Sequence, residues 1–572
     1  MVEFFDTFTD EQRALITNSA DSLLVAAPAG SGKTRVLIGK LYQLVVDGVP
    51  PDRLCVLTFT KKSAQDIRSR LSALVAESMS TLTCHTFHSF ALECLRADSG
   101  TMALGNDFQV LSPSQSIGLL RSVIEEVSPE LSLSARDVAK LYRELSVSIN
   151  CNQSIEGRLD RLPFEAPVNL ISSWLDIFVE RKLQQKAVDY DDLLFLFTLL
   201  LETDDEYRGR IAERYVHVLV DEYQDVNDLQ ARMVELLSSH HHRVFAIGDH
   251  AQSIYGFRGA NIRHFRQFLN TYPGGQIGQL GVNFRSNRVI VRLAESLLKQ
   301  DRHFADRNVS SARGLGDRVS LVGSPSSEAE AEFIASEISR LTQDGLAPSE
   351  ISILVRLKSQ APQIELMLKT KGVPVNVKVG GSFLERVHVK DALALLRLVN
   401  EPTHEGSWRL LFAHLTGFGP VLSTAAAQYV TGQIKRFGSL DQMQRAQLFE
   451  TTVLQGVGAL LDGTKNILNL WCQVTGSTRH QVSQDTERDL LRVGALWSEQ
   501  KDFHTLSDAL SFSNSSDDFC EQRTPEVTLL SIHQSKGLEW HTVFVPGLNE
   551  GTLPVFGAGK NDDGLEEERR LL

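Results

Sequence analysis

The sequence of 572 residues predicts an α/β fold with two parallel sheets, each carrying a mainly helical insertion. Two observations point to this class. Short runs of β-branched and other apolar residues are apolar nearly throughout, as strands covered on both faces are. Helical patterns lie between these runs, and such an alternation of strand and helix is typical of a parallel sheet. The runs form two groups, so we predict two α/β domains.

The first group of runs predicts the strands of the first sheet. These runs are Leu23–Ala27, Leu54–Phe59, Val216–Val220 and Val244–Ile247. A long stretch within the group, residues 109–201, is rich in Leu, Ser and Glu and has helical periodicity. We therefore assign residues 1–108 and 202–282 to the first domain, and residues 109–201 to its helical insertion.

The second group of runs predicts the strands of the second sheet. These runs are Val319–Val322, Ile351–Val355, Val527–Ile532 and Val543–Val545. Residues 383–519 have the same helical character as the first long stretch. We assign residues 283–382 and 520–572 to the second domain, and residues 383–519 to its helical insertion.

Composition narrows the class of protein. A net charge of −13 and a pI of about 5.7 argue against a simple basic coat on nucleic acid. They leave room for a DNA-binding protein whose positive charge is confined to a cleft. The six cysteines form no CxxC pair, which argues against a zinc or iron–sulfur site and favours free thiols in a reducing compartment. The sequence has no signal-peptide pattern and no run of about 20 apolar residues, so we expect a soluble, cytoplasmic protein with no membrane partner.

A glycine-rich loop follows the first predicted strand and precedes the helical pattern of residues 36–44. This context is that of a P-loop, whose backbone N–H groups approach phosphate oxygens. The predicted nucleotide-binding residues of the loop are Ala27, Pro28, Ala29, Gly30, Ser31, Gly32, Lys33 and Thr34. Lys33 is expected to place its charge at the β and γ phosphates, and Thr34 to offer its hydroxyl to Mg²⁺. Ala27 stands where the generic pattern has glycine.

Two adjacent carboxylates, Asp221 and Glu222, follow the apolar run of residues 218–220. At the carboxyl edge of a parallel sheet such groups face a bound nucleotide. We expect Asp221 to hold Mg²⁺, and Glu222 to act as general base on the attacking water. An Asp-Glu pair alone is typical of a solvated strand end, but together with the P-loop it predicts a nucleoside triphosphatase.

A series of further motifs narrows the class. In chain order they are Phe8–Gln12, Thr58–Ala64, Thr86–Ser89, Asp221–Asp225, Gly248–Ala260, Asn283–Ser286 and Ser531–Glu539. This ordered series resembles that of UvrD-like helicases, the UvrD/Rep/PcrA group of superfamily 1, over nearly the whole chain. The resemblance implies two RecA-like P-loop domains that close on ATP. It also implies a helicase or translocase that moves 3′ to 5′ on single-stranded DNA, in DNA repair or replication restart.

The resemblance implies ATP contacts beyond the loop. Gln12 would read the adenine edge, which favours ATP over GTP, and Phe284, where the family usually has tyrosine, would stack on the adenine. Gln252 and Arg285 would contact the γ-phosphate, and Glu539 the ribose. The implied catalytic residues are Lys33, Asp221, Glu222, Gln252 and Arg285.

The resemblance also implies a track for DNA. Its residues would be Phe59, Lys61, Thr86, Phe87, His88, Tyr255, Phe257, Arg258 and His533. Aromatic rings stack on bases without reading sequence, and Lys61 suits a phosphate. The implied partners are single-stranded DNA, junctions of single- and double-stranded DNA, and repair or replication proteins. For each ring taken singly, a core aromatic near a strand end is the alternative.

Two stretches leave alternatives open. Asp189–Leu193 contains three carboxylates that suggest a metal site, but we favour a helix N-terminus stabilised by the helix dipole. The chain ends in Glu566–Leu572, which resembles the opening of the family's final motif. An arginine that reaches the γ-phosphate follows this opening in the family, and Arg569 and Arg570 do not correspond to it. The alternative function is therefore an ATP- and DNA-binding fragment with little or no turnover.

Overall fold

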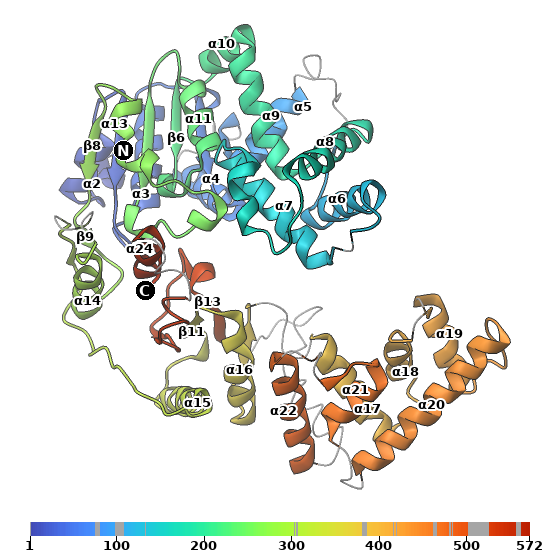
Figure 1. Cartoon of the computed structure of the whole chain (residues 1–572). Coiled ribbons are helices and arrows are strands. Elements are labelled where there is room, and N and C mark those ends of the chain that lie inside the picture. Colours follow the sequence, from blue (N-terminus) through green and yellow to red (C-terminus); the bar gives the residue numbers. More distant parts are fainter. Residues whose placement is uncertain are drawn as a thin grey trace. The chain divides into compact units, whose positions relative to one another are not determined.

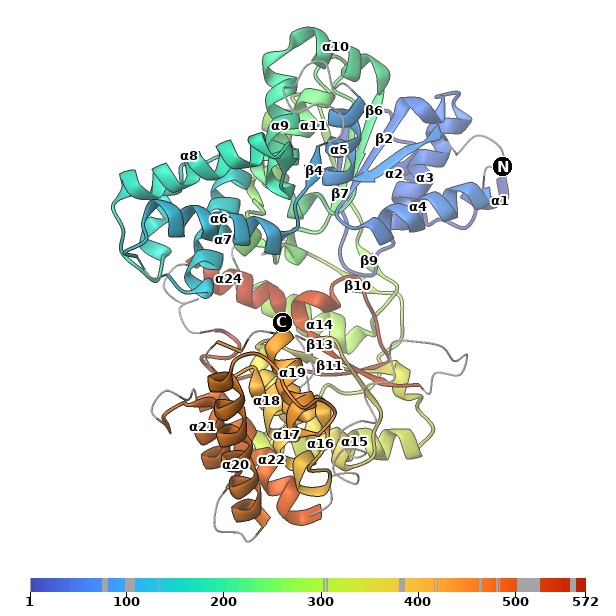
Figure 2. The same ribbon diagram turned by 90° about the vertical axis from the view of Figure 1, so that its right-hand side faces the viewer.

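The chain forms two compact units, Met1–Ser320 with Ala558–Leu572, and Leu321–Gly557. Figures 1 and 2 trace both units in two views. The computed structural model describes residues 2–74, 81–97, 108–131, 133–301, 304, 307–379, 386–415, 417–418, 420–461, 466–479, 482, 484–500, 525–555 and 562–572. None of the described helices combines the length and the apolar character that crossing a bilayer requires.

The first unit is built on a six-stranded parallel sheet with the order β3-β2-β6-β7-β1-β8. The strands are β1 (Ser22–Ala26), β2 (Leu54–Thr58), β3 (Thr83–Thr86), β6 (His217–Val220), β7 (Val244–Gly248) and β8 (Gln276–Gln279). The four strands predicted for this sheet are confirmed, and they are its four inner strands. The two edge strands, β3 and β8, were not predicted.

Helices cover both faces of this sheet, which explains why its inner strands are apolar throughout. Successive residues of a strand point to opposite faces, and so Leu23 and Val25 of β1 pack in one core cluster while Leu24 packs in the other. The helices of the first cluster are α3 (Lys33–Val46) and α4 (Lys61–Leu74), and those of the second are α5 (Phe87–Ala97), α9 (Tyr190–Thr203) and α11 (Asp228–Leu237).

Three helices of the predicted first insertion share a core of their own (Figure 2). They are α6 (Pro113–Val127), α7 (Ala135–Asn150) and α8 (Val168–Gln184). The short strands β4 (Gln109–Val110) and β5 (Ala187–Val188) pair where this segment leaves and rejoins the first unit's sheet core. The prediction also counted α9 as part of the insertion, but the buried side chains of α9 belong to the core of the sheet.

The stretch Asp189–Leu193 is confirmed as a helix N-terminus. Asp189 caps α9, and its carboxylate accepts a hydrogen bond from the backbone N–H of Asp192 at 3.0 Å. The buried Lys182 ammonium lies 2.9 Å from Asp189 and 2.6 Å from Asp192. Two of the three carboxylates are thus partners of a lysine, and the third, Asp191, accepts a hydrogen bond from Asn150 at 2.6 Å.

The first unit ends with segments that lie beside the glycine-rich loop and the 249–258 segment. β9 (Val282–Asn283) pairs with β10 (Ser310–Ser311), and α14 (Arg288–Leu298) lies between them in the chain. α24 (Asp562–Leu571) packs against α14 and against the short helix η5 (His250–Gln252). Packing thus joins residues up to Ser320 with the first sheet, whereas the prediction begins the second domain at residue 283.

The second unit contains a four-stranded parallel sheet with the order β12-β13-β11-β14. Its strands are β11 (Ile351–Val355), β12 (Val375–Val377), β13 (Val527–Ser531) and β14 (Thr542–Phe544), and α15 (Ser327–Gln343) and α16 (Ala361–Thr370) pack in its core. A separate core joins α17 (Val387–Asn400), α18 (Glu405–Phe412), α19 (Pro420–Val430), α20 (Leu440–Leu461), α21 (Ile467–Thr475) and α22 (Gln484–Gln500). The predicted limits of this helical insertion, at residues 382–383 and 519–520, lie outside the described residues.

One predicted strand is wrong. Val319–Val322 has no strand pairing, and Val319, Leu321 and Val322 are 51%, 87% and 47% exposed. A run of β-branched residues forms a strand only where a neighbouring strand completes its hydrogen bonds and a face is buried. Neither condition is met by residues 319–322, so their apolar character does not make them part of a sheet.

Candidate nucleotide and DNA site

The glycine-rich loop joins β1 to α3 at the carboxyl edge of the first sheet. The N–H of Ala27 donates to the carbonyl of Gly248 at 2.8 Å, which anchors the start of the loop on the neighbouring strand β7. Gly30 and Gly32 have φ angles of 69° and 86°, the left-handed region that glycine adopts without strain. α3 begins at Lys33, and its N-cap residue Gly32 makes no side-chain capping bond. The first N–H groups of α3 are therefore available to an anion.

Space above Gly30 is closed to any side chain. A Cβ atom there would lie 2.6 Å from Cβ of Arg285 and 2.8 Å from Oδ1 of Asn283. The N–H of Phe284 donates to the carbonyl of Gly30 at 2.8 Å, and Oδ1 of Asn283 accepts from the N–H groups of Arg285 and Ser286, both at 2.8 Å. Residues 283–286 thus contact the glycine-rich loop, as the ATP contacts predicted for Phe284 and Arg285 require.

Gln12 lies beside the loop and is 3% exposed. It belongs to α2 (Asp10–Ile16), where its side chain forms a capping box with Thr9. Its Nε2 donates to the carbonyl of Ser31 at 3.0 Å, and its Oε1 accepts from the N–H of Thr9 at 3.2 Å. Each amide atom has capacity for a second hydrogen bond. The geometry is compatible with the predicted reading of an adenine edge, which stays a prediction.

The paired carboxylates follow β6. Asp221 is buried, and its N–H donates to the carbonyl of Leu57 on β2 at 3.0 Å. Glu222 is half-buried and has a φ angle of 52°, a left-handed conformation that costs a non-glycine residue about 1–3 kcal/mol. Such strain is often retained at functional sites because it aims a side chain. The hydroxyl of Thr34 and the carboxylate of Asp221 are hard oxygen donors of the kind that Mg²⁺ prefers alongside water and substrate phosphates.

Gln224 was not predicted as a site residue, although it lies in the motif Asp221–Asp225. It is fully buried, and its Nε2 donates to Oε2 of Glu222. Its Oε1 accepts from the N–H of Asp249 at 2.8 Å. The amide of Gln224 therefore links the carboxylate of Glu222 to the end of the neighbouring strand β7.

Asp249 was also missed as a site residue, and it joins three parts of the site. Its buried carboxylate accepts from the N–H of Ala29 at 3.1 Å, from Nε2 of Gln252 at 2.8 Å and from the guanidinium of Arg307 at 2.8 Å. Burial alone would raise the pKa of Asp249, but Arg307 and then Lys33 hold that pKa well below its usual range. Arg307 lies in no motif, so no signal in the sequence pointed to it.

The loop after Gln252 presents aromatic side chains. Phe257 is 53% exposed, and its ring centroid lies 6.1 Å from that of Tyr255. The guanidinium of Arg258 lies over both rings, 5.2 Å from the centroid of Tyr255 and 5.5 Å from that of Phe257. Two of the predicted DNA-binding aromatics and the predicted arginine therefore form one cluster, which we call the aromatic loop (Tyr255–Arg258).

The other aromatic positions divide into surface and core. Phe59 is partly buried and packs against Phe87, with ring centroids 5.8 Å apart. Phe87 is 1% exposed and lies in the core of the sheet, which is the alternative that the sequence left open for each ring. We therefore leave Phe87 out of the proposed DNA surface. Thr86 is buried as well, and its hydroxyl donates to Oγ of Ser89 at 2.9 Å.

His88 has a neighbour that the sequence did not suggest. The exposed ring of Tyr190 meets His88 edge to face, with centroids 6.0 Å apart. Burial lowers the pKa of His88 to about 4, so its ring is neutral near pH 7. Tyr190 follows the N-cap of α9, and its exposure makes it a further candidate for stacking on a base. Lys61 is exposed at the start of α4.

Two predicted site residues belong to the second unit. His533 is half-buried in the short helix η12 (Ile532–Ser535), and Glu539 is exposed before β14. Their predicted contacts with DNA and with the ribose stay predictions.

Comparison with known proteins agrees with the architecture of both units. Residues 8–273 match the UvrD/REP helicase N-terminal domain, and residues 279–430 and 466–572 match the UvrD-like helicase C-terminal domain. The chain is 27% identical to the ATP-dependent DNA helicase PcrA of Leuconostoc citreum, over 98% of this chain and 79% of that protein. It is 28% identical to the ATP-dependent DNA helicase UvrD1 of Mycobacterium tuberculosis, over 100% of this chain and 80% of that protein. The matched domains cover most of the sequence, and the chain belongs to the UvrD/REP helicase family.

Proposed function

We propose that this protein is an ATP-driven motor that moves 3′ to 5′ along single-stranded DNA and separates strands at junctions with duplex. One observation carries the proposal. Within residues 249–258, the side chain of Gln252 donates to Asp249, and Asp249 in turn accepts from the N–H of Ala29 in the glycine-rich loop. The aromatic loop follows Gln252 by only a few residues. A single short segment thus connects a triphosphate site with a surface suited to bases, which is what coupling of hydrolysis to movement requires.

Each residue of the nucleotide site has a chemical task in this proposal. Lys33 and the N–H groups at the start of α3 bind the phosphates of ATP, and Thr34 and Asp221 hold Mg²⁺, which offsets phosphate charge. Glu222, held by Gln224, orients the attacking water and takes its proton. Gln252 and Arg285 contact the γ-phosphate. When hydrolysis removes that phosphate, residues 249–258 and 283–286 change position.

The DNA surface combines rings and positive charge. Tyr255, Phe257 and Arg258 provide one cluster of two rings and a guanidinium. Further contacts that we propose at the carboxyl edge of the same sheet are Phe59, Lys61, His88 and Tyr190. Stacking on rings tolerates every base, so we expect binding that depends steeply on salt and little on base sequence. DNA repair or replication restart, in the cytoplasm, is the setting that we infer from the bacterial relatives.

ATP turnover with and without single-stranded DNA tests the proposal. We expect turnover that DNA stimulates, and unwinding of a duplex with a 3′ single-stranded tail but not of one with a 5′ tail. Nucleotide and DNA binding without turnover would instead support the binding-fragment alternative. Unwinding only from a 5′ tail would contradict the proposed polarity while leaving the motor in place.

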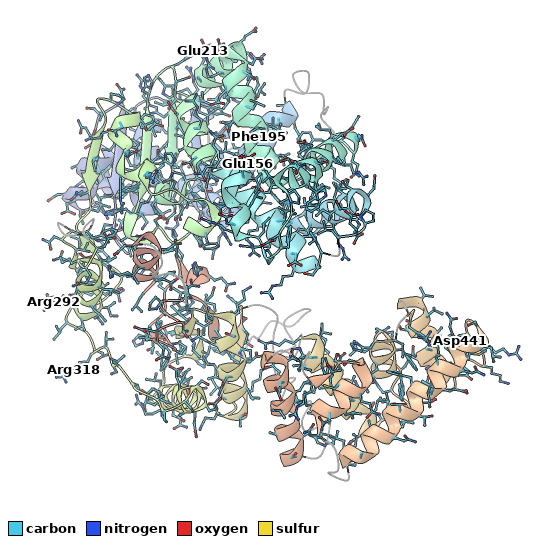
Figure 3. The ribbon with its side chains drawn as sticks, in the orientation of Figure 1. Glu156, Phe195, Glu213, Arg292, Arg318 and Asp441 are labelled. Carbon is cyan, nitrogen blue, oxygen red and sulfur yellow. The ribbon has the colours of Figure 1, made fainter. Side chains whose placement is uncertain are left out.

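Truncation of Phe257 is expected to weaken the grip on DNA. Phe257→Ala removes a 53% exposed ring, and loss of one base–aromatic stack costs about 1–3 kcal/mol of binding free energy. The dissociation constant for a fluorescent oligothymidylate measures the effect at fixed salt concentration. Phe195→Ala is the matched control, because Phe195 is a similarly exposed ring, at 42%, on α9 and lies outside the motifs that predict the DNA track (Figure 3). Equal dissociation constants for Phe257→Ala and the parent would count against a stacking role.

A further inference from the structure

Arg307 lies in no motif, yet its guanidinium is buried between two carboxylates. Its side chain is 12% exposed, and those of Asp249 and Glu295 are 3% and 13% exposed. Nη1 and Nη2 donate to the two oxygens of Asp249 at 2.8 and 3.4 Å, and Nε donates to Glu295 on α14 at 3.0 Å. A buried charged group of this kind is weak evidence for stability, because desolvation offsets much of the attraction. Its two hydrogen bonds to Asp249 instead indicate that Arg307 fixes the position and charge of that carboxylate.

The carboxylate of Asp249 determines which way Gln252 faces. An ionised carboxylate accepts hydrogen bonds and donates none, so the nitrogen of the Gln252 amide must turn toward it, at 2.8 Å, and the amide oxygen away. Oδ2 of Asp249 also accepts from the N–H of Ala29 in the phosphate loop. One carboxylate therefore positions both the loop and the amide that we propose to respond to the γ-phosphate.

We propose that Arg307 is a positioning residue for ATP hydrolysis, which holds the Asp249 carboxylate in place and through it orients Gln252 and the phosphate loop. The inference rests on the proposed function. Because Arg307 also contacts Glu295, a shift of α14 moves the guanidinium and is transmitted to Gln252. Arg307 thus joins α14 to the response to the third phosphate.

Electrostatics give this role a signature that packing alone would not produce. Among the described residues, the charged or titratable groups with the largest effect on the pKa of Asp249 are Arg307, Lys33 and His250, and Glu295 pairs with the other side of Arg307. Burial raises the pKa of Asp249, and Arg307 is the largest influence that lowers it. Without Arg307, the pKa of Asp249 therefore rises. As the pH falls through that raised pKa, Asp249 gains a proton. The protonated carboxyl has an O–H donor in place of part of its acceptor capacity, so it can no longer accept all the hydrogen bonds that the carboxylate accepts.

Arg307→Met is the first test. We expect its turnover at pH 7.5 to fall roughly ten- to a hundredfold, the size of a lost hydrogen bond to a charged group. We expect its affinity for ADP to change by less than about threefold, while its preference for a non-hydrolysable ATP analogue over ADP falls roughly tenfold. On acidification its turnover should decline at a higher pH than that of the parent. Arg292→Met, which removes the same charge from an exposed position on α14 (Figure 3), should alter none of these quantities.

Two further variants distinguish a positioning role from a folding defect. Arg307→Met leaves the buried carboxylate of Asp249 without its arginine, which can destabilise the fold. The double variant Arg307→Met with Asp249→Asn removes that charge as well, so we expect it to fold and still to lack the preference for the ATP analogue. Arg307→Lys restores the charge and should return the acid decline toward that of the parent. A folded Arg307→Met or double variant with the parental nucleotide preference and pH profile would overturn the inference. Failure of the parent itself to hydrolyse ATP would count against the proposed function instead.

Discussion

Lys33→Ala is expected to abolish ATP turnover while leaving the fold intact. The Lys33 ammonium lies at the start of α3, where it donates to the carbonyl of Ala27 at 3.3 Å and contributes little to the core. Its charge is needed at the β and γ phosphates, where negative charge grows as the bond breaks. Removal of one such group costs at least about 10²–10³-fold in rate. Phosphate release in the presence of single-stranded DNA measures the effect.

A second lysine of the same helix provides the control. Lys40 donates to the carbonyls of Ile16 and Asn18 at 3.1 and 2.7 Å, so it braces α2 against α3. Lys40→Ala should lower the melting temperature and leave turnover per folded molecule unchanged, which is the opposite pattern to that of Lys33→Ala. Normal turnover in Lys33→Ala would show that the glycine-rich loop does not bind the reacting phosphates.

Glu222→Gln should bind ATP with nearly the parental affinity and hydrolyse it about 10²–10⁴-fold more slowly. The amide keeps an oxygen that can accept the hydrogen bond from Gln224, so the local structure survives. Only the capacity to take a proton from water is lost. Binding of a fluorescent ATP analogue and single-turnover hydrolysis separate the two properties.

An exposed glutamate serves as the matched control for Glu222→Gln. Glu213 lies on α10 (Asp205–Arg214), and Glu213→Gln makes the same change of charge at the surface (Figure 3). We expect that variant to bind and hydrolyse ATP like the parent. A loss of ATP binding in Glu222→Gln would mean that Glu222 holds the substrate or its metal ion rather than activating water.

Local patterns in the sequence were sufficient for the inner strands of the first sheet and for the glycine-rich loop between β1 and α3. Strands buried on both faces must be apolar throughout, and a glycine-rich turn between such a strand and a helix is recognisable within a few residues. The edge strand β8 was missed because three of its four residues are exposed and it carries no apolar run. Val319–Val322 was misassigned for the converse reason, since the run is apolar but has no strand beside it.

The sequence by itself determined the family, the glycine-rich loop between β1 and α3, and the position of Asp221 and Glu222 after β6, because each depends on neighbours in the chain. Only the tertiary structure decided that Phe87 is buried at 1% exposure while Phe257 is 53% exposed, although both lie in motifs of the same series. It also showed that Arg307 contacts Asp249, 58 positions away in the chain. Through Asp249 and Glu295, Arg307 is linked to the glycine-rich loop, to Gln252 and to α14. Burial and ion pairing between distant segments depend on how elements pack, and no local pattern of residue types encodes that packing.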